Sequence, residues 1–252
     1  MKYIFAGDRE ISVRVLDFMI KKGHSPLALI VNNPGGSHSG ELMDVSKLSD
    51  DNIFDQSFFL DEEKISSFLD LEIHYIICIH YPFIIPQLIL DLPKIGVLNL
   101  HPAYLPYNKG WHTPTWTILD NTVCGATLHF MSEELDKGDI VHQKKIEILH
   151  SDTANTLYKR ILELEFEVFT ESFNSIVSLN PDRIKQGNNG SLHKKNDLFE
   201  INELNIRENT NVGYFLNKLR ALTTNEIKEA AYFKKDGSKY AVQIKIKKIN
   251  DE

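Results

Sequence analysis

The opening of the chain constrains the fold most, because two short apolar runs flank a stretch with helical periodicity. Lys2 to Ala6 and Ala28 to Val31 each predict a short buried strand. Between Val13 and Ile20 the apolar side chains recur at helical spacing, which predicts a helix that connects the two strands. Such a β-α-β start is typical of an open sheet, so we expect an α/β fold.

The middle of the chain continues the alternation of apolar strands and helices. Tyr75 to Ile79 and Val97 to Leu100 predict two more buried strands. Thr113 to Leu119 predicts a helix, and Cys124 to Met131 predicts a strand after it. Apolar residues then share one helical face from Leu157 to Val177, which predicts a long amphipathic helix.

A polar stretch from Lys185 to Asn196 divides the chain unevenly. Polar, glycine-containing segments of this kind are typical of domain boundaries. We therefore expect a large domain formed by residues 1–182 and a small C-terminal domain formed by residues 183–252.

The small domain is expected to hold a helix and a β-hairpin. Val212 to Ala221 predicts the helix, and Asp236-Gly237 predicts the turn of the hairpin. Tyr240, Val242 and Ile244 alternate with more polar residues, so we expect one face of the second hairpin strand to be buried.

Composition narrows the class of protein. The formal net charge of −7 over 252 residues argues against a dedicated nucleic-acid-binding protein, since that class usually carries a basic surplus. The longest apolar zone, Ile73 to Leu92, is interrupted by histidine, proline and aspartate, so we expect no membrane span.

The N-terminus has no signal-peptide pattern, and Cys78 and Cys124 lie in apolar runs. We therefore expect a cytoplasmic protein with buried, reduced thiols.

Two polar residues stand at the end of the strand predicted from Val97. Asn99 and His101 are two positions apart, so on an extended segment they face the same side. Open α/β sheets bind ligands beyond the carboxyl ends of their strands. An amide beside an imidazole suits the stabilisation or protonation of a developing oxyanion. The alternative is a polar strand end that is merely solvated.

An acidic loop, Glu133 to Ile140, follows the strand that ends near Met131. A carboxylate there, such as Asp136, would orient His101 and favour its protonated form, or accept the proton of an attacking amine. Asp-Lys-Gly-Asp is also favourable turn chemistry, so a solvated turn is the alternative.

The segment NLHPAYLPYNKGW…GATLHFMSEELDKGDIV resembles the formyltransferases that use 10-formyltetrahydrofolate. Their pattern is N-x-H-P-(small)-x-L-P, then G-x-T-x-H, then L/I-D-x-G-x-I, and all three pieces occur here in order. The resemblance covers Met1 to Ile148 and implies an open Rossmann-like formyltransferase core. It also implies that Asn99, His101 and Asp136 are catalytic, with His129 as the second histidine of the G-x-T-x-H strand.

The resemblance also implies where the formyl donor binds. The segment from Ile79 to Pro86 fits the folate loop of the family loosely, and its backbone would bond the pterin ring. The residues expected to bind 10-formyltetrahydrofolate are Phe83, Ile84, Ile85, Asp136 and Asp139. The histidines lack a convincing set of metal ligands, so no metal is expected.

Other motifs are similar to those of the dTDP-amino-sugar N-formyltransferases within this family. They are LPYNKGW and the C-terminal sequence FLNKLRALTT…AAYFKKDGSKYAVQIKI. The resemblance implies a dTDP-linked amino sugar as acceptor, with dTDP-4-amino-4,6-dideoxyglucose favoured, a homodimer through the C-terminal region, and a role in O-antigen synthesis. The residues expected to bind the sugar nucleotide are Arg9, Lys109 and Trp111. Core packing is the alternative for Trp111, and solvated charge is the alternative for the other two.

Three further functions stay open at this point. Methionyl-tRNA formylation is opposed by the acidic net charge and by LPYNKGW. Hydrolysis of formyltetrahydrofolate is opposed by the absence of the regulatory N-terminal region of such enzymes. A non-catalytic folate-binding protein would hold folate and release no tetrahydrofolate with any amine.

Overall fold

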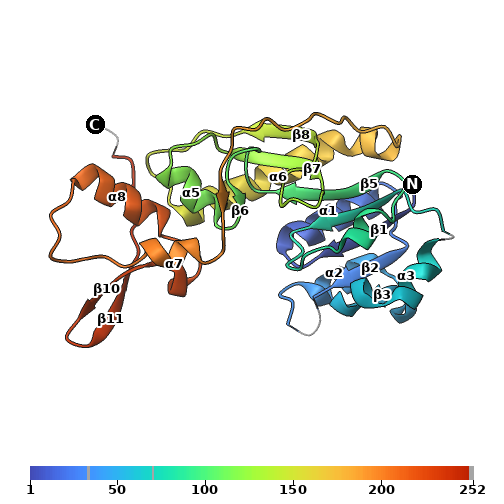
Figure 1. Cartoon of the computed structure of the whole chain (residues 1–252), viewed down its shortest axis with the longest axis horizontal. Helices are drawn as coiled ribbons and strands as arrows, with labels where there is room; N and C mark the ends of the chain where they lie inside the picture. Colours follow the sequence, from blue (N-terminus) through green and yellow to red (C-terminus); the bar gives the residue numbers. More distant parts are fainter. Residues whose placement is uncertain (33–34, 70, 250–252) are drawn as a thin grey trace. The chain divides into compact units, whose positions relative to one another are not determined.

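The computed structural model describes residues 1–32, 35–69 and 71–249 (Figure 1). Contacts divide the chain into two compact units. The first unit comprises Met1–His101, Thr127–Gln143 and Glu165–Gln186. The second unit comprises Pro102–Ala126, Lys144–Leu164 and the described residues from Gly187 onward.

A seven-stranded sheet, counted over the described residues, forms the centre of the fold. Its strands are β1 (Tyr3–Gly7), β2 (Ala28–Val31), β3 (Ile53–Phe54), β4 (Tyr75–Ile79), β5 (Gly96–His101), β7 (Gly125–Phe130) and β8 (Ile140–Lys145). They lie in the order β3-β2-β1-β4-β5-β7-β8, parallel from β3 to β5 and antiparallel between β5 and β7. The expected open α/β sheet is therefore confirmed, and the strand order reverses between β1 and β4.

All the predicted helices are present, together with short helices that the sequence pattern did not predict. They are α1 (Glu10–Lys21), α2 (Ser39–Ser46), α3 (Glu62–Leu69), α4 (Gln87–Leu90), α5 (Thr113–Leu119), α6 (Ala154–Val177), α7 (Asp197–Ile201) and α8 (Val212–Ala221). Single 3₁₀ turns lie at Asp50–Asn52, Gln56–Leu60 and Ile227–Glu229. Among the described residues, no helix is both long and apolar enough to cross a membrane.

The core of the first unit explains why its strands read as continuous apolar runs. Every residue of β1, β2 and β4 is buried, because other elements cover both faces of these strands. Ile4, Ile30 and Ile76 pack with phenylalanines that include Phe58 and Phe68 in one cluster. A rigid set of central strands therefore supports the strand ends at which the predicted catalytic residues lie.

The second unit is built around short elements. β6 (Lys109–Gly110) pairs with β9 (Leu192–His193), and β10 (Ala231–Lys235) pairs with β11 (Ser238–Val242). The predicted hairpin turn is confirmed, since Asp236 and Gly237 both have positive φ, 50° and 77°. The predicted burial of one face is wrong for Tyr240, which is 48% exposed and stacks on Phe233 across the ladder. In a two-stranded sheet, only the neighbouring side chain on the opposite strand covers such a residue.

The division into units differs from the linear boundary expected at residue 182. Residues 102–126 and 144–164 group with the C-terminal segment, and residues 165–186 group with the N-terminal part. In the second unit, α5 packs on α8, and the Thr115 hydroxyl donates to the carbonyl oxygen of Ala221 at 2.9 Å. Such contacts between distant segments are invisible to a boundary read from local composition.

Candidate active site

The predicted catalytic residues come from two neighbouring strands and the loop that follows one of them. β5 and β7 are antiparallel, with Asn99 opposite His129 and His101 opposite Thr127. Residues directly opposite on neighbouring strands project to the same face, as do residues two positions apart on one strand. The side chains of Asn99, His101 and His129 therefore converge on one face of the sheet.

Asp136 lies between two imidazoles. Its Oδ2 is 3.6 Å from Nδ1 of His101, and its Oδ1 is 3.6 Å from Nε2 of His129. The three side chains are only 8%, 7% and 1% exposed. Poor solvation makes the attraction between this carboxylate and a positive imidazole stronger than it would be in water.

Over the described residues, no group of three or more His, Cys, Asp or Glu side chains is placed to hold a metal ion.

His129 is neutral near pH 7. Burial lowers its pKa to about 4, against the opposing attraction of Asp136. Its Nδ1 lies 2.8 Å from the carbonyl oxygen of Phe130, which can only accept, so Nδ1 carries the proton. Nε2 is then an acceptor, and the amide nitrogen of Asn99 donates to it over 3.2 Å. His129 thereby fixes the orientation of the Asn99 amide.

A close backbone approach shapes the loop that carries Asp136. Asp136 has a φ of 52°, in the left-handed region that aspartate tolerates better than most residues. At Gly138, an added Cβ would lie 1.9 Å from the carbonyl oxygen of Phe130. Glycine therefore lets the loop return to the end of β7, which gives the D-x-G part of the motif a physical reason.

Sequence reasoning missed two long-range contacts in this unit. Nε2 of Gln186 donates to the carbonyl oxygens of Asp136 and Gly138, at 2.8 Å each. Nε2 of His80, directly after β4, lies 2.8 Å from Oε1 of Glu165, whose side chain is fully buried. Glu165 did leave a signal in the sequence, because it occupies a position on the apolar face of the predicted long helix.

The predicted donor-binding residues differ in exposure. Phe83 and Ile84 are 40% and 91% exposed, whereas Ile85 is 5% exposed and belongs to the core cluster. Ile85 therefore offers a ligand its backbone and not its side chain, in line with the backbone contacts that we expect. The carbonyl oxygen of Asp139 accepts from the Phe130 amide at 2.8 Å, which ties this residue to the end of β7.

The predicted nucleotide-binding residues are divided between the units. Arg9 is exposed in the first unit, and its Nη1 lies 3.5 Å from the Ser37 hydroxyl. Lys109 belongs to β6 in the second unit. Trp111, in the same unit, is 43% exposed, and the Lys195 ammonium lies 4.9 Å from its ring centre. The core-packing alternative for Trp111 is therefore wrong, and the binding role of all three residues stays a prediction.

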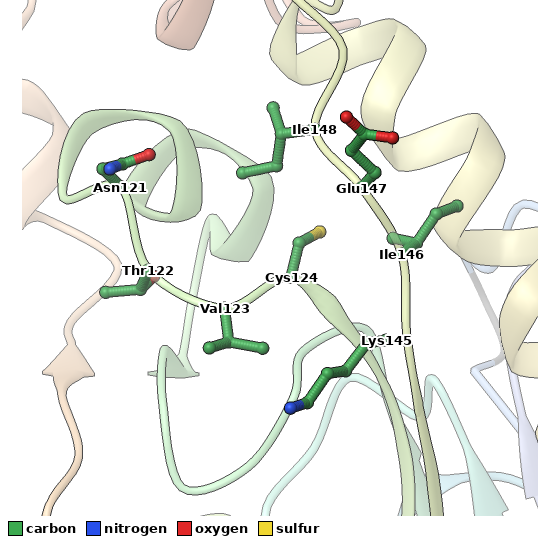
Figure 2. A pocket seen from close by; sticks show the side chains of 8 residues that line it. All are labelled: Asn121, Thr122, Val123, Cys124, Lys145, Ile146, Glu147 and Ile148. Atoms are coloured by element: carbon green, nitrogen blue, oxygen red, sulfur yellow. The ribbon is translucent and has the colours of Figure 1, made fainter.

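A surface pocket of about 400 Å³ lies within the second unit (Figure 2). It is lined by Asn121, Thr122, Val123, Cys124, Lys145, Ile146, Glu147 and Ile148. Figure 2 shows that these residues come from two chain segments that run side by side, one entering β7 and one leaving β8. The lining includes none of the predicted catalytic or binding residues.

The sequence as a whole matches models of known families. The model described as "Formyl transferase" matches residues 7–173, which is more than half of the chain. The chain belongs to the formyl transferase family. A second model, "N-formyltransferase dimerization C-terminal domain", matches residues 197–248. The expected formyltransferase family is thus confirmed, and the two matches fall on either side of the predicted boundary after residue 182.

Relatives within the formyl transferase family carry names that point to different acceptors. The dTDP-4-amino-4,6-dideoxyglucose formyltransferase of Mycobacterium tuberculosis is 30% identical, over 63% of this chain and 67% of its own. The methionyl-tRNA formyltransferase of Mycoplasmopsis pulmonis is 29% identical, over 96% of this chain and 84% of its own.

Solved structures of formyltransferases share the fold. A 4-N formyltransferase from Francisella tularensis matches with a TM-score of 0.83 and 22% identity, over 98% of each chain. The N-formyltransferase from Helicobacter canadensis, in complex with folinic acid and dTDP-3-aminofucose, matches with a TM-score of 0.70 and 22% identity. That match covers 94% of this chain and 85% of the other. The Rossmann-like formyltransferase core expected from the sequence is confirmed.

Proposed function

We propose that the protein transfers the formyl group of 10-formyltetrahydrofolate to the amine of a dTDP-linked amino-dideoxy sugar. The observation that carries the proposal is the convergence of Asn99, His101, His129 and Asp136 on one face at the end of β5. Acyl transfer to an amine needs hydrogen-bond donors for an oxyanion and a base for the proton of the amine. These side chains supply both kinds of group.

The first step would be attack of the sugar amine on the formyl carbon, which places a negative charge on the formyl oxygen. One N–H of the Asn99 amide points at His129. We assign its second N–H, together with the protonated imidazole of His101, to the oxyanion. A preorganised donor of this kind contributes about 3–4 kcal/mol to lowering the barrier.

Asp136 would act on the other charges of the reaction. The carboxylate of Asp136 lies 3.6 Å from Nδ1 of His101 and would balance a positive charge on that imidazole during the reaction. It would also accept the proton that the attacking amine loses. The bond between the formyl carbon and N10 of the folate then breaks, the proton taken up by Asp136 passes to N10, and tetrahydrofolate and the N-formyl sugar leave. Separations of 3.6 Å are compatible with this role, since catalytic hydrogen bonds often tighten only when substrate binds.

The two substrates would meet different parts of the chain. For the donor we propose Phe83, Ile84 and Ile85 against the pterin, with Asp136 and Asp139 beside it. For the acceptor we propose Arg9 and Lys109 as cations for the diphosphate and the exposed ring of Trp111 as a stacking surface. Few cations suffice for one diphosphate, so an acidic chain is compatible with a dTDP-sugar.

Methionyl-tRNA is the second candidate acceptor, and one observation favours it. The relative from Mycoplasmopsis pulmonis aligns over 96% of this chain and is named for that substrate. The net charge of −7 argues against it, because binding to a polyanion depends on neutralising many phosphates with basic side chains. We therefore place the amino sugar first, with dTDP-4-amino-4,6-dideoxyglucose as the favoured acceptor.

The experiment that tests the proposal offers the protein a panel of acceptors. 10-Formyltetrahydrofolate is incubated with dTDP-amino sugars bearing the amine at the 3- or 4-position, and with methionyl-tRNA. Mass spectrometry then reports which acceptor gains one formyl group. A gain on one dTDP-sugar supports the proposal and names the substrate. A gain on methionyl-tRNA alone, or on no acceptor at all, refutes it.

We further propose a homodimer formed through residues 183–252, a cytoplasmic location and a role in O-antigen synthesis. The match of residues 197–248 to a dimerization domain supports the dimer. So do exposed apolar side chains in this region, including Val212 at 71%, Leu216 at 46% and Tyr240 at 48%. Val212 and Leu216 are four positions apart on α8 and therefore share one face. Light scattering of Leu216→Glu against wild type tests whether this face forms the dimer.

A further inference from the structure

We infer that Gln186 is a positioning residue for Asp136. Its side-chain amide holds the two backbone carbonyls on either side of Lys137, and so keeps the carboxylate of Asp136 between His101 and His129. The inference deepens the proposed function and rests on it for the catalytic role of Asp136. It assigns no chemistry to Gln186 itself.

The contact uses both hydrogens of one amide group. Nε2 of Gln186 lies 2.8 Å from the carbonyl oxygen of Asp136 and 2.8 Å from that of Gly138. Since carbonyl oxygens only accept, the NH₂ end of the side chain must face them. Oε1 of Gln186 is buried and has no hydrogen-bond partner among the described residues. The side-chain amide therefore binds the backbone of the loop and not the charged carboxylate of Asp136.

The loop needs these hydrogen bonds because much of it is exposed to solvent. Leu135 is 54% exposed and the side chain of Lys137 is 44% exposed, yet the side chain of Asp136 between them is only 8% exposed. Asp136 also holds a left-handed backbone, with φ at 52°. Lys137 N donates to the Glu134 carbonyl over 3.3 Å, a long hydrogen bond. Because most of the loop is exposed, hydrogen bonds from outside the loop are needed to keep the Asp136 carboxylate buried.

Gln186 is itself well fixed. The amide of Ile140 donates to the carbonyl of Ile184 at 2.7 Å, and the amide of Ile184 donates back at 2.9 Å. The guanidinium of Arg183 lies 3.6 Å from the centre of the Phe130 ring. The segment from Arg183 to Gln186 is thus attached to both ends of the β7–β8 connection. A fixed donor of this kind can set the position of the loop.

The kinetic test compares Gln186→Leu with Lys185→Ala, in which the changed side chain is the exposed neighbour. Displacing a catalytic group by the order of 1 Å can lower a rate about 100-fold, so we expect Gln186→Leu to lower kcat at least about tenfold. The KM for the amino sugar should stay within about threefold, because none of its proposed contacts, Arg9, Lys109 and Trp111, lies in this loop. Lys185→Ala should behave like wild type.

A second measurement reports on the loop and needs no activity. Trypsin cleaves after Lys137, the residue between the two anchored carbonyls. Release of the loop should speed this cut under native conditions at least about tenfold, since cleavage of a folded protein follows local opening. Mass spectrometry identifies the new fragment that begins at Gly138, and cuts within the β10–β11 hairpin serve as the internal reference.

The outcomes separate the two claims. If wild type transfers formyl groups and Gln186→Leu matches Lys185→Ala in kcat and in the Lys137 cut, the inference is wrong. If the cut is faster while kcat is unchanged, Gln186 holds the loop without positioning catalysis, and the inference is also wrong. If wild type transfers no formyl group, the proposed function fails, and the catalytic part of the inference fails with it. If Gln186→Leu does not fold, Gln186→Asn replaces it, because that side chain keeps the amide but falls one carbon short.

Discussion

The amide nitrogen of Asn99 lies 3.2 Å from Nε2 of His129, directly across the β5–β7 ladder. His129 can accept this hydrogen bond because burial keeps it neutral and its Nδ1 proton is donated to the Phe130 carbonyl. The orientation of an amide that would bind an oxyanion is therefore set by a buried imidazole on the neighbouring strand. This assigns His129 a structural task that differs from the task proposed for His101.

Replacing His129 by leucine should lower kcat, because the Asn99 amide loses the acceptor that orients it. We expect a decrease of about 10- to 100-fold, smaller than that for deleting a direct oxyanion donor. The matched control is His142→Leu, since His142 is 38% exposed and bonds Glu171 outside the catalytic set. Steady-state formyl transfer is the measurement. Equal rates for the two variants would contradict the role given to His129.

The pH dependence of stability should carry the signature of buried His129. The pKa of His129 in the folded protein is about 4, below its ordinary value of 6.5, so between these values the unfolded chain binds a proton that the native protein does not. Stability from the neutral ring is therefore complete above pH 6.5 and decreases as the pH falls towards 4. We expect this group to remove about 2 kcal/mol of the free energy of unfolding between pH 7 and pH 5. Urea unfolding at both pH values is the measurement. In His129→Gln, the decrease in the free energy of unfolding between pH 7 and pH 5 should be smaller by this amount.

Neutralising Asp136 should nearly abolish formyl transfer. In Asp136→Asn the group that balances a positive His101 and accepts the amine proton is gone, and we expect kcat to decrease about 10²- to 10⁴-fold. Glu134→Gln, on the same loop, removes a carboxylate whose side chain is 69% exposed and should leave kcat within about twofold. Asn99→Ala and His101→Ala extend the series. Near wild-type turnover in all three folded variants would show that the catalytic assignment is wrong.

Gly138→Ala should displace the catalytic loop. The new Cβ would lie 1.9 Å from the Phe130 carbonyl oxygen, which belongs to the backbone and cannot rotate away. We expect a destabilisation of about 1–3 kcal/mol together with a decrease in kcat. Gly187→Ala is the matched control, because an added Cβ there meets nothing within 4 Å. Thermal unfolding and turnover of the two variants, measured in parallel, should diverge.

The pair formed by His80 and Glu165 should be coupled in stability. Removing the imidazole in His80→Ala leaves a fully buried carboxylate without its hydrogen-bond partner, and we expect a loss of about 3–5 kcal/mol. Adding Glu165→Leu should recover a large part of this loss, because the buried charge goes as well. A double-mutant cycle by urea unfolding gives the coupling energy. Additive losses would show that the two side chains do not depend on each other.

Local sequence pattern predicted much of the fold because the relevant forces are local. The helices α5 and α8 coincide with the predicted ranges, since their apolar spacing and end residues lie within the segments themselves. The strand that holds Asn99 was predicted from its apolar run, to within one residue at each end. The exposure of Tyr240 was not predicted. Period-two alternation shows which side chains share a face, but not whether anything covers that face.

For the site, the sequence by itself determined which residues are candidates: the motifs contain Asn99, His101, His129 and Asp136, and the two-residue spacing of the first two puts them on one side. Only the tertiary structure decided how they act together. It placed His129 opposite Asn99, made the buried imidazole neutral, and brought Gln186 to the loop from fifty residues away. The physical reason is that register, burial and long-range hydrogen bonds arise from packing between distant segments, which no window along the chain contains.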